Sequence, residues 1–580
     1  LGPAGKTKAI DSSPYTGTIF SNNTLFIDLY ELTKEEWCEI LPEKTFDSIV
    51  KNNPNAGQNK TAYSYIFNEQ EKALREAYKN YREKLANISS LNDKEKNILE
   101  GIKSNFEVYK EENKEWLEKD AVYEALSIKH GNDYWPLWKD EIDKNLYNPE
   151  NEEQAGACEA RLQEIKTEYA EEIEYYNFCQ FIAAVQKQKI REFALENNIK
   201  LIADRQVAFS DRDYWANQKL FLKGWNLGCP PDYFSKDGQA WGFPVMDPEK
   251  LFNPDGSLGE GGKLLKALFV KMFKENPGGV RIDHIIGLID PWVYKSGKKP
   301  KPEEGAGRLY SSPEHPELAK YAKVSIDDLN PELEPDKEYR VAKLTKAQIK
   351  DYASLMEKIV IEAAKEQNLT KDSIICEDLG TLTYPVECVM KELGLNGMRL
   401  TQFVVPEKPN HPYRCWNIES NQWAMVGTHD NQPIKMWADS MINTHECYLH
   451  AKNLAEDLLP EERKGETDEF IHRLTTDADF LAKMKLVELF TCNARNIQIF
   501  FTDFFGIEDV YNKPGTSGDQ NWSLRLPDNF EEFYFAQLEK GKGLNLPEIL
   551  KLVIEARGQK FINGNTELLE KLENYINMFK

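Results

Sequence analysis

Amphipathic helical segments occupy the early part of the chain. Apolar residues recur at helical spacing from about residue 68 to 120, and the Glu and Lys residues between them are typical of a solvated helix face. A second such stretch, about 155–198, ends at Asn197-Asn198. The apolar run 199–209 follows directly, so the pattern predicts a helix that leads into a strand.

The pattern then changes to short apolar runs that are separated by helical stretches. Strands are predicted at residues 280–283, 373–377, 397–403, 423–430 and 496–503. Strands that alternate with helices indicate a parallel α/β architecture. Residues 295–340 are rich in Pro, Lys, Glu and Gly and lack apolar periodicity, which predicts a long insertion or loop.

Composition excludes several classes of protein. The 580 residues include 73 Lys plus Arg and 96 Asp plus Glu, and the net charge of −23 disfavours nucleic acid as a partner. No run of about 18 apolar residues is present and mean hydropathy is −0.61, so we expect no membrane-spanning helix. The nine cysteines are an odd number without a CxxC motif, which favours reduced thiols and a cytoplasmic location.

Three of the predicted strands end in a carboxylate where the apolar run gives way to a loop: Asp283, Glu377 and Asp430. In a parallel barrel such residues converge on one face, so carboxylates far apart in the sequence can meet around one substrate. The alternative is that each carboxylate caps the helix that follows. This helix-capping alternative is less favoured because the pattern occurs three times, with His284 and His429 beside two of the carboxylates.

Paired carboxylates suit glycosidic chemistry, in which one carboxyl protonates the leaving oxygen while the other attacks the anomeric carbon or activates water. Aromatic rings suit a sugar substrate because they offer it a flat apolar face. Tyr233 and Trp241 lie in loop-like sequence and are candidates for this role, although each aromatic residue taken alone is more often part of a core.

Other motifs do not fit a catalytic or cofactor site. His445 and His450 are five residues apart, unlike the i, i+4 pair of a zinc-binding HExxH helix. The Gly-rich stretch 256–263 has the wrong glycine spacing for a phosphate loop, and Leu264 stands where Ser or Thr would bind magnesium. No GxSxG motif occurs and no cluster has metal-ligand spacing, so no metal site is predicted. No cofactor is predicted either, because a mechanism carried by carboxylates does not need one.

Five segments, taken in order, resemble the amylomaltases, the 4-α-glucanotransferases of glycoside hydrolase family 77. They are Ser13-Pro-Tyr15, the pair Gly228-Cys-Pro-Pro-Asp-Tyr-Phe-Ser235 and Gly238-Gln-Ala-Trp-Gly-Phe-Pro244, Val280-Arg-Ile-Asp-His284, Cys376-Glu-Asp-Leu-Gly380, and Gly427-Thr-His-Asp-Asn431. Weaker similarities extend over most of the chain and include Asn512-Lys-Pro-Gly-Thr516.

The resemblance implies a (β/α)8 TIM barrel with inserted, mostly helical subdomains and a retaining double displacement on maltooligosaccharides or other α-1,4-glucans. Asp283 would be the nucleophile, Glu377 the acid and base, and Asp430 a residue that binds and distorts the reacting sugar. Arg281 would keep Asp283 ionised, and Glu377 needs a raised pKa to stay protonated until it acts. The substrate-binding residues implied are Tyr15, Asp232, Tyr233, Gln239, Trp241, Arg281, His284, His429 and Asn512.

The chain departs from the family pattern at several places. Phe243 stands where the family usually has Asn after Trp-Gly, and Gln432-Pro433 replaces the usual Asp-Thr. The run 203–215 is shorter than the common pattern, and the family's Asp there corresponds to either Asp211 or Asp213. These changes are expected to affect specificity more than chemistry.

The resemblance also implies a domain organisation. Leu-Gly-Pro closes the second barrel strand in the family. The sequence is therefore expected to be part of a longer protein, with the first two barrel strands missing from it. The expected parts are a barrel segment (1–60), a helical subdomain (61–198), barrel with a substrate loop at 228–250 (199–294), an insertion or long loop (295–350) and the remainder of the barrel (351–580).

Three alternative functions remain open at this point. An α-glucan hydrolase would use the same residues, since it differs only in whether water or sugar attacks the intermediate. A non-catalytic glucan-binding protein is disfavoured by the presence of Asp283, Glu377 and Asp430. An unrelated barrel enzyme such as an aldolase needs a Schiff-base Lys or a metal site at a strand end, and neither is apparent.

Overall fold

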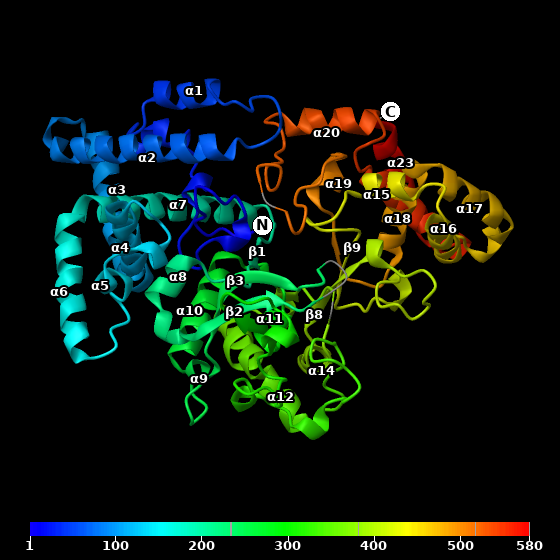
Figure 1. The fold of residues 1–580 in the computed structure, drawn as a ribbon. Coiled ribbons are helices and arrows are strands. Elements are labelled where there is room, and N and C mark those ends of the chain that lie inside the picture. The colour runs from blue at the N-terminus through cyan, green and yellow to red at the C-terminus, as the bar shows by residue number, and fades with distance from the viewer. Residues whose placement is uncertain (232–234, 381, 517, 579–580) are drawn as a thin grey trace. The chain divides into compact units, whose positions relative to one another are not determined.

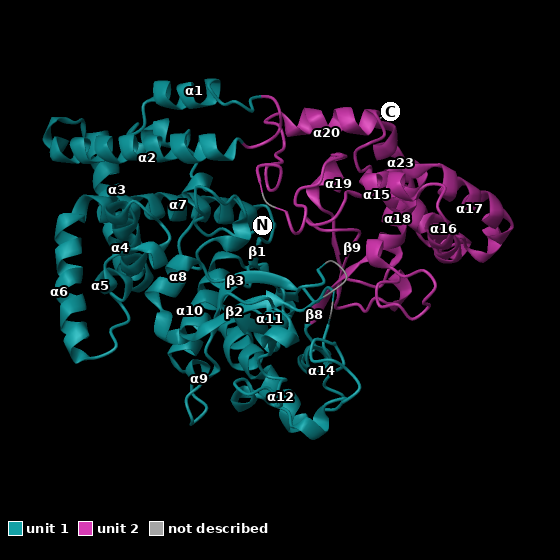
Figure 2. Cartoon of the chain, viewed as in Figure 1, with its two compact units in different colours: residues 1–56, 62–395 teal, residues 57–61, 396–580 magenta. Residues whose placement is uncertain are grey.

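The computed structural model describes residues 1–231, 235–380, 382–516 and 518–578. The chain forms two compact units (Figure 2): unit 1 comprises Leu1–Ala56 and Ala62–Leu395, and unit 2 comprises Gly57–Thr61 and Asn396–Lys580. Among the described residues, no helix combines the length and the apolar character that crossing a membrane requires.

Unit 1 contains three parallel strands that carry the first group of candidate residues. They are β1 (Ile202–Arg205), β4 (Gly279–Ile282) and β7 (Ile374–Cys376), with β4 in the middle. In the register, Asp204 is opposite Arg281 and Ile282 is opposite Cys376. The strands are almost wholly buried, and the burial includes the charged residues Asp204 and Arg205.

Helices that follow these strands in the sequence bury their apolar faces in the same core. The helix α10 (Glu260–Glu275) contributes Leu265, Leu268, Phe269 and Phe273. A second helix runs through α12 (Lys346–Leu355), a π-helical segment (Met356–Ile361) and α13 (Glu362–Glu366). Shorter helices in this part of unit 1 are α8 (Asp211–Ala216), α9 (Pro248–Leu251), α11 (Ile286–Ile289) and α14 (Tyr384–Leu393).

A second, antiparallel sheet of unit 1 holds the region predicted as a substrate loop. Its strand order is β3-β2-β5-β6. The strands are β2 (Phe221–Cys229), β3 (Gln239–Met246), β5 (Trp292–Lys295) and β6 (Gly307–Arg308). Between residues 309 and 345 the chain forms only short 3-10 turns and irregular segments.

The early helical part of unit 1, coloured blue to cyan in Figure 1, has its own aromatic core. Phe178 on α7 stacks on Tyr81 of α2 with ring centroids 4.5 Å apart, and it lies 5.5 Å from the ring of Phe106 on α3. The helices are α1 (Glu43–Lys51), α2 (Tyr63–Ala86), α3 (Asp93–Glu112), α4 (Lys114–His130), α5 (Glu141–Lys144), α6 (Glu152–Glu168) and α7 (Ala170–Glu196).

Unit 2 also has three parallel strands, β8 (Asn396–Leu400), β9 (Trp423–Met425) and β10 (Asn496–Gln498), with β9 between the other two. Its helices are α15 (Ile434–Met441), α16 (His445–Leu458), α17 (Thr467–Thr476), α18 (Ala478–Thr491), α19 (Phe501–Phe505), α20 (Phe530–Glu539), α21 (Leu546–Ala556), α22 (Gln559–Gly564) and α23 (Thr566–Met578).

The strands predicted from the sequence exist, but several are shorter than their apolar runs. The run 199–209 forms a strand only at Ile202–Arg205. The run 496–503 is a strand only at Asn496–Gln498, and its second half enters the helix α19. The helical stretch 68–120 is broken between α2 and α3, where Asn92 and Glu95 form a capping box that starts the second helix.

Candidate active site

Asp283 and Glu377 follow neighbouring parallel strands at the same edge of the sheet. The backbone ladder continues past both strand ends, because Glu377 N–H donates to the Ile282 carbonyl (2.9 Å) and Ile285 N–H donates to the Glu377 carbonyl (3.1 Å). On the other side, Asp283 N–H donates to the Arg205 carbonyl (2.9 Å). These bonds hold the backbone of both carboxylates on a rigid part of the fold.

Arg281 joins two carboxylates of unit 1. Its Nη1 atom donates to Asp204 Oδ1 (2.7 Å) and to Asp283 Oδ1 (3.0 Å). Burial opposes the charged guanidinium, but the carboxylates of Asp204 and Asp283 outweigh it and raise the Arg281 pKa well above its usual value. Tyr15 completes the group because its hydroxyl donates to Asp204 Oδ2 (2.7 Å).

Glu377 has a different environment. Both of its carboxyl oxygens accept backbone hydrogen bonds: Oε2 from His284 N–H and Oε1 from Leu379 N–H, each at 2.8 Å. Burial raises the pKa of Glu377 above its ordinary value and outweighs the opposing effects of Arg281 and of these hydrogen bonds. The direction of this shift agrees with the raised pKa that the sequence analysis predicts for Glu377.

His284 directly follows Asp283, and its backbone N–H donates to Glu377 Oε2. Its backbone is in the left-handed region (φ 46°), which is uncommon for a residue other than glycine. Burial, together with the charge of Arg308, lowers the pKa of the imidazole to about 4, so the ring is neutral near pH 7. The ring meets Trp241 edge-on, with centroids 5.0 Å apart.

Trp241 and Gln239 come from β3 and contact each other, since Trp241 Nε1 donates to Gln239 Oε1 (3.2 Å). The Trp241 side chain is half-buried. The next residue, Gly242, has a φ of +77° and donates its N–H to the Tyr294 hydroxyl (2.9 Å). The contact with His284 therefore brings the predicted aromatic platform next to the strand ends of unit 1.

The third candidate carboxylate belongs to unit 2. Asp430 lies shortly after β9, and its Oδ1 accepts a hydrogen bond from Asn512 Nδ2 (2.6 Å). His429 Nε2 is 3.4 Å from Asp430 Oδ2, and the Asn512 N–H donates to the His429 carbonyl (3.0 Å). The ring of Trp522 lies 5.4 Å from that of His429. Asn512, which the sequence proposed from a different segment, thus joins His429 and Asp430 in one cluster within unit 2.

The comparisons with known proteins identify the family. The model of glycoside hydrolase family 77, described as 4-alpha-glucanotransferase, matches residues 1–530. The chain belongs to this family. It is therefore an enzyme of the 4-α-glucanotransferase class.

Curated relatives in this family agree with that assignment. The 4-alpha-glucanotransferase of Clostridium butyricum is 28% identical over 453 residues, which are 75% of this chain and 73% of the relative. The chloroplastic/amyloplastic 4-alpha-glucanotransferase of Solanum tuberosum is 26% identical over 545 residues, which are 91% of this chain and 75% of the relative.

Solved structures of the family share the fold. The amylomaltase from Streptococcus agalactiae in complex with acarbose superimposes with a TM-score of 0.63 at 21% identity, covering 92% of this chain and 89% of that chain. The amylomaltase from Corynebacterium glutamicum gives 0.61 at 17% identity and covers 98% of this chain and 69% of that one. The predicted α/β, TIM-barrel-like fold with added helices is confirmed.

Sequence reasoning missed Asp204, the carboxylate opposite Arg281. The two aspartates that the sequence offers for the family's Asp in this run have other contacts: Asp213 caps α8 with Ser210, and Asp211 forms an ion pair with Lys8. A signal was present in the sequence, because Asp204 follows the apolar residues Leu201-Ile202-Ala203.

Two of the predicted glucan-binding residues, Asp232 and Tyr233, lie outside the described residues. In the part of the chain that is described, no group of three or more His, Cys, Asp and Glu side chains has the geometry to hold a metal ion.

Proposed function

We propose that this glycoside hydrolase family 77 enzyme transfers α-1,4-glucan segments between maltodextrins by a retaining double displacement through a covalent glucosyl-enzyme on Asp283. One observation carries the proposal: two carboxylates follow adjacent parallel strands in different environments. Asp283 is ion-paired with Arg281, whereas burial raises the pKa of Glu377. Such a pair supplies the nucleophile and the acid that a retaining mechanism needs.

In the first half of the reaction, the Asp283 carboxylate attacks the anomeric carbon of the donor glucan. Glu377 gives its proton to the glycosidic oxygen, so that the bond from carbon to oxygen breaks and the shorter chain leaves with a new hydroxyl group. Arg281 favours the ionised form of Asp283, which is the form that attacks.

In the second half, the ionised Glu377 takes the proton from the 4-hydroxyl group of an acceptor glucan. The oxygen of that hydroxyl group attacks the anomeric carbon, and the ester bond to Asp283 breaks. Two inversions retain the α configuration. Asp430, with Asn512 and His429 around it, binds the sugar that reacts.

The remaining predicted residues would bind the glucan. The half-buried Trp241 offers a ring to a sugar face, and the neutral His284 ring beside it accepts or donates a hydrogen bond to a hydroxyl group. Tyr15 is held by Asp204, close to the nucleophile strand. We predict that the substrates are starch or maltodextrins. We also predict that the enzyme is located in the cytoplasm.

Product analysis with maltotriose tests this function, with Asp283→Asn as the matched inactive variant. Glucose together with maltopentaose and longer chains, all absent with the variant, is the expected result. Glucose and maltose alone would mean that water accepts the glucosyl group, and the enzyme would be a hydrolase. No product from a well-folded chain would contradict both forms of the proposal.

A further inference from the structure

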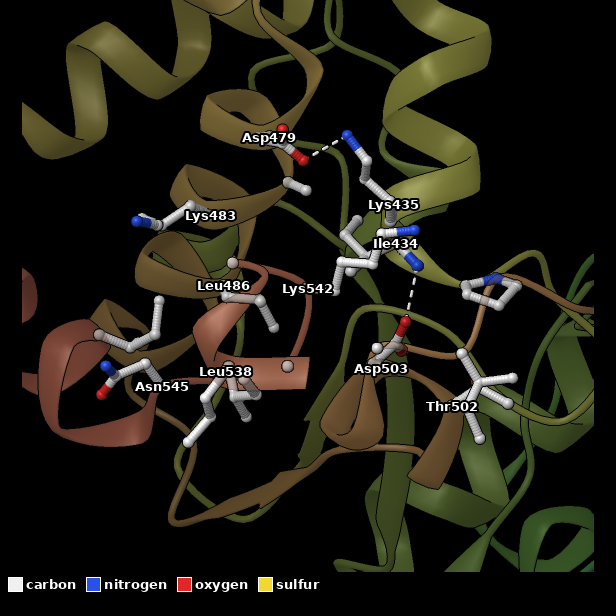
Figure 3. A pocket seen from close by; sticks show the side chains of 18 of the residues that line it. Ile434, Lys435, Asp479, Lys483, Leu486, Thr502, Asp503, Leu538, Lys542 and Asn545 are labelled. Carbon is white, nitrogen blue, oxygen red and sulfur yellow. Dashed lines mark hydrogen bonds and ion pairs between the residues drawn. The ribbon is translucent and has the colours of Figure 1, made fainter. Parts of the chain in front are cut away.

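Unit 2 contains a cavity of about 120 Å³ that involves none of the proposed catalytic residues. Its walls come from the start of α15, from α18 and α19, and from the segment that leads into α21 (Figure 3). All of its lining residues belong to unit 2.

Asp503 is a buried carboxylate in the wall of this cavity. The residue is 7% exposed. Its Oδ1 accepts the hydrogen bond of Ile434 N–H, at 2.6 Å, as the dashed line in Figure 3 marks. The second oxygen, Oδ2, has no hydrogen-bond partner among the described residues. Because Asp503 lines the cavity and Oδ2 is not a fully buried atom, this oxygen can accept a hydrogen bond from a molecule there.

The lysines that line the cavity are already paired with carboxylates other than Asp503. Three lysines line it, and each is paired with a carboxylate: Lys435 with Asp479, Lys483 with Glu548 (2.8 Å) and Lys542 with Glu508 (3.0 Å). An anion would have to compete with these carboxylates for the lysines. The ammonium groups have three N–H donors each, so they can also bind a neutral oxygen ligand.

Apolar side chains form another part of the lining and include Leu486, Leu538 and Ile549, while Thr502 and Asn545 add polar groups. An apolar wall, donors on lysines and an acceptor on Asp503 match the surface of a small polyol, which has C–H faces and hydroxyl groups that both donate and accept. A purely apolar ligand would leave Asp503 Oδ2 unsatisfied.

We propose that this cavity binds a single neutral sugar unit, of which glucose is the one that the enzyme itself releases. The choice of glucose rests on the proposed function, because transfer from maltotriose releases it. The sugar donates a hydroxyl hydrogen bond to Asp503 Oδ2, accepts from a lysine, and places a C–H face on the leucines. This site is separate from the residues assigned to catalysis.

Hydrogen–deuterium exchange of the full chain with D-glucose tests the proposal, because peptides report where protection occurs. Glucose is expected to slow exchange in residues 501–507 and 541–549. At a concentration about ten times Kd, local opening slows by about tenfold. Sodium sulfate is the comparison probe. Protection by sulfate instead of glucose would overturn the proposal in favour of an anion site, and no protection by either would mean a cavity filled by water alone.

Three variants make the test specific. Asp503→Asn keeps an oxygen for Ile434 N–H but turns the free acceptor into a donor, and Ala482→Leu fills the cavity without removing a polar group. Both are expected to lose the protection, while Lys540→Met, outside the lining, keeps it. Protection that survives Ala482→Leu would contradict the proposal even if Asp503→Asn fails to fold.

The same preparations are assayed for transfer with maltotriose, which separates the two proposals. A chain that transfers glucan but shows no protection overturns the cavity site alone. A chain that is protected by glucose but does not transfer overturns the proposed function and leaves the site standing.

Discussion

Asp204 and Arg281 lie directly opposite each other on β1 and β4, and one guanidinium nitrogen bridges Asp204 and Asp283. The bridge fixes the direction from which Arg281 approaches the proposed nucleophile. Since Asp204 also accepts the Tyr15 hydroxyl, a single carboxylate orients two side chains of the site.

Replacing Asp204 is expected to lower kcat more than it raises KM. In Asp204→Asn, Arg281 and Tyr15 lose their common charged partner, and a misplacement of about 1 Å at the nucleophile costs about 100-fold in rate. Steady-state kinetics with maltotriose measures the effect. Asp211→Asn is the matched control, because Asp211 is paired with Lys8 and not with Arg281 or Tyr15. Equal rates for the two variants would refute the role of Asp204.

The raised pKa of Glu377 has a consequence for the pH profile. Because the proton must be present in the free enzyme, kcat/KM falls as pH rises through this pKa, and this alkaline limb lies above the ordinary Glu value of about 4.3. Rates with maltotriose between about pH 4 and 9 locate the limb. In Glu392→Gln, an exposed control, the limb stays where it is. A profile without an alkaline limb would contradict the assignment of the acid.

Asp457 on α16 is expected to make the free energy of unfolding depend on pH. Both of its carboxyl oxygens are buried without a hydrogen-bond partner among the described residues, and burial, aided by the charge of Glu488, raises its pKa from 3.8 to about 8. The folded chain therefore holds a proton between these two values that the unfolded chain has lost. The contribution of Asp457 to the free energy of unfolding falls as pH rises through this window and is constant above it.

Asp457→Asn is expected to reduce that loss, because an amide carries no proton that titrates. Urea unfolding at about pH 5 and pH 8 measures the free energies, and the variant should gain stability relative to the parent at the higher pH. The exposed Asp468→Asn on α17 is the control. A parent and a variant with the same pH dependence would show that Asp457 titrates normally.

The aromatic core of the early helices predicts a large stability difference between two residues of one helix. Phe178→Ala on α7 removes a fully buried ring that contacts Tyr81 and Phe106, at a cost of about 3–5 kcal/mol. Phe193→Ala, on the same helix but 66% exposed, should change the free energy of unfolding by less than about 0.5 kcal/mol. Denaturant unfolding compares them, and similar costs would argue against this packing.

Local pattern predicted the strands that matter most, because each is a buried apolar run that ends abruptly in a carboxylate. Residues 280–283 and 373–377 are of this kind, and β4 and β7 lie there. The run 496–503 was predicted too long, since the same apolar residues pack equally well in a helix once β10 ends. Asp204 was missed because its partner Arg281 is 77 residues away, and pairing across strands cannot be read from local pattern.

The early motif Ser13-Pro-Tyr15 is a second case in which the sequence alone does not predict the position of a residue. Its sequence suggests a site residue through resemblance alone, whereas its position depends on a hydrogen bond to Asp204, 189 residues away. The pKa values of Glu377 and His284 are likewise set by burial in the folded chain, and the residue types alone do not give them.

Mass spectrometry of the trapped intermediate tests the central claim most directly. Glu377→Gln is incubated with an α-maltotriosyl fluoride donor, whose fluoride leaves without needing a proton, while the missing base slows the second step. We predict a chain that gains the mass of one maltotriosyl group, with the sugar on the peptide that contains Asp283. An unmodified chain that still releases fluoride, or a sugar attached to a different residue, would contradict the mechanism.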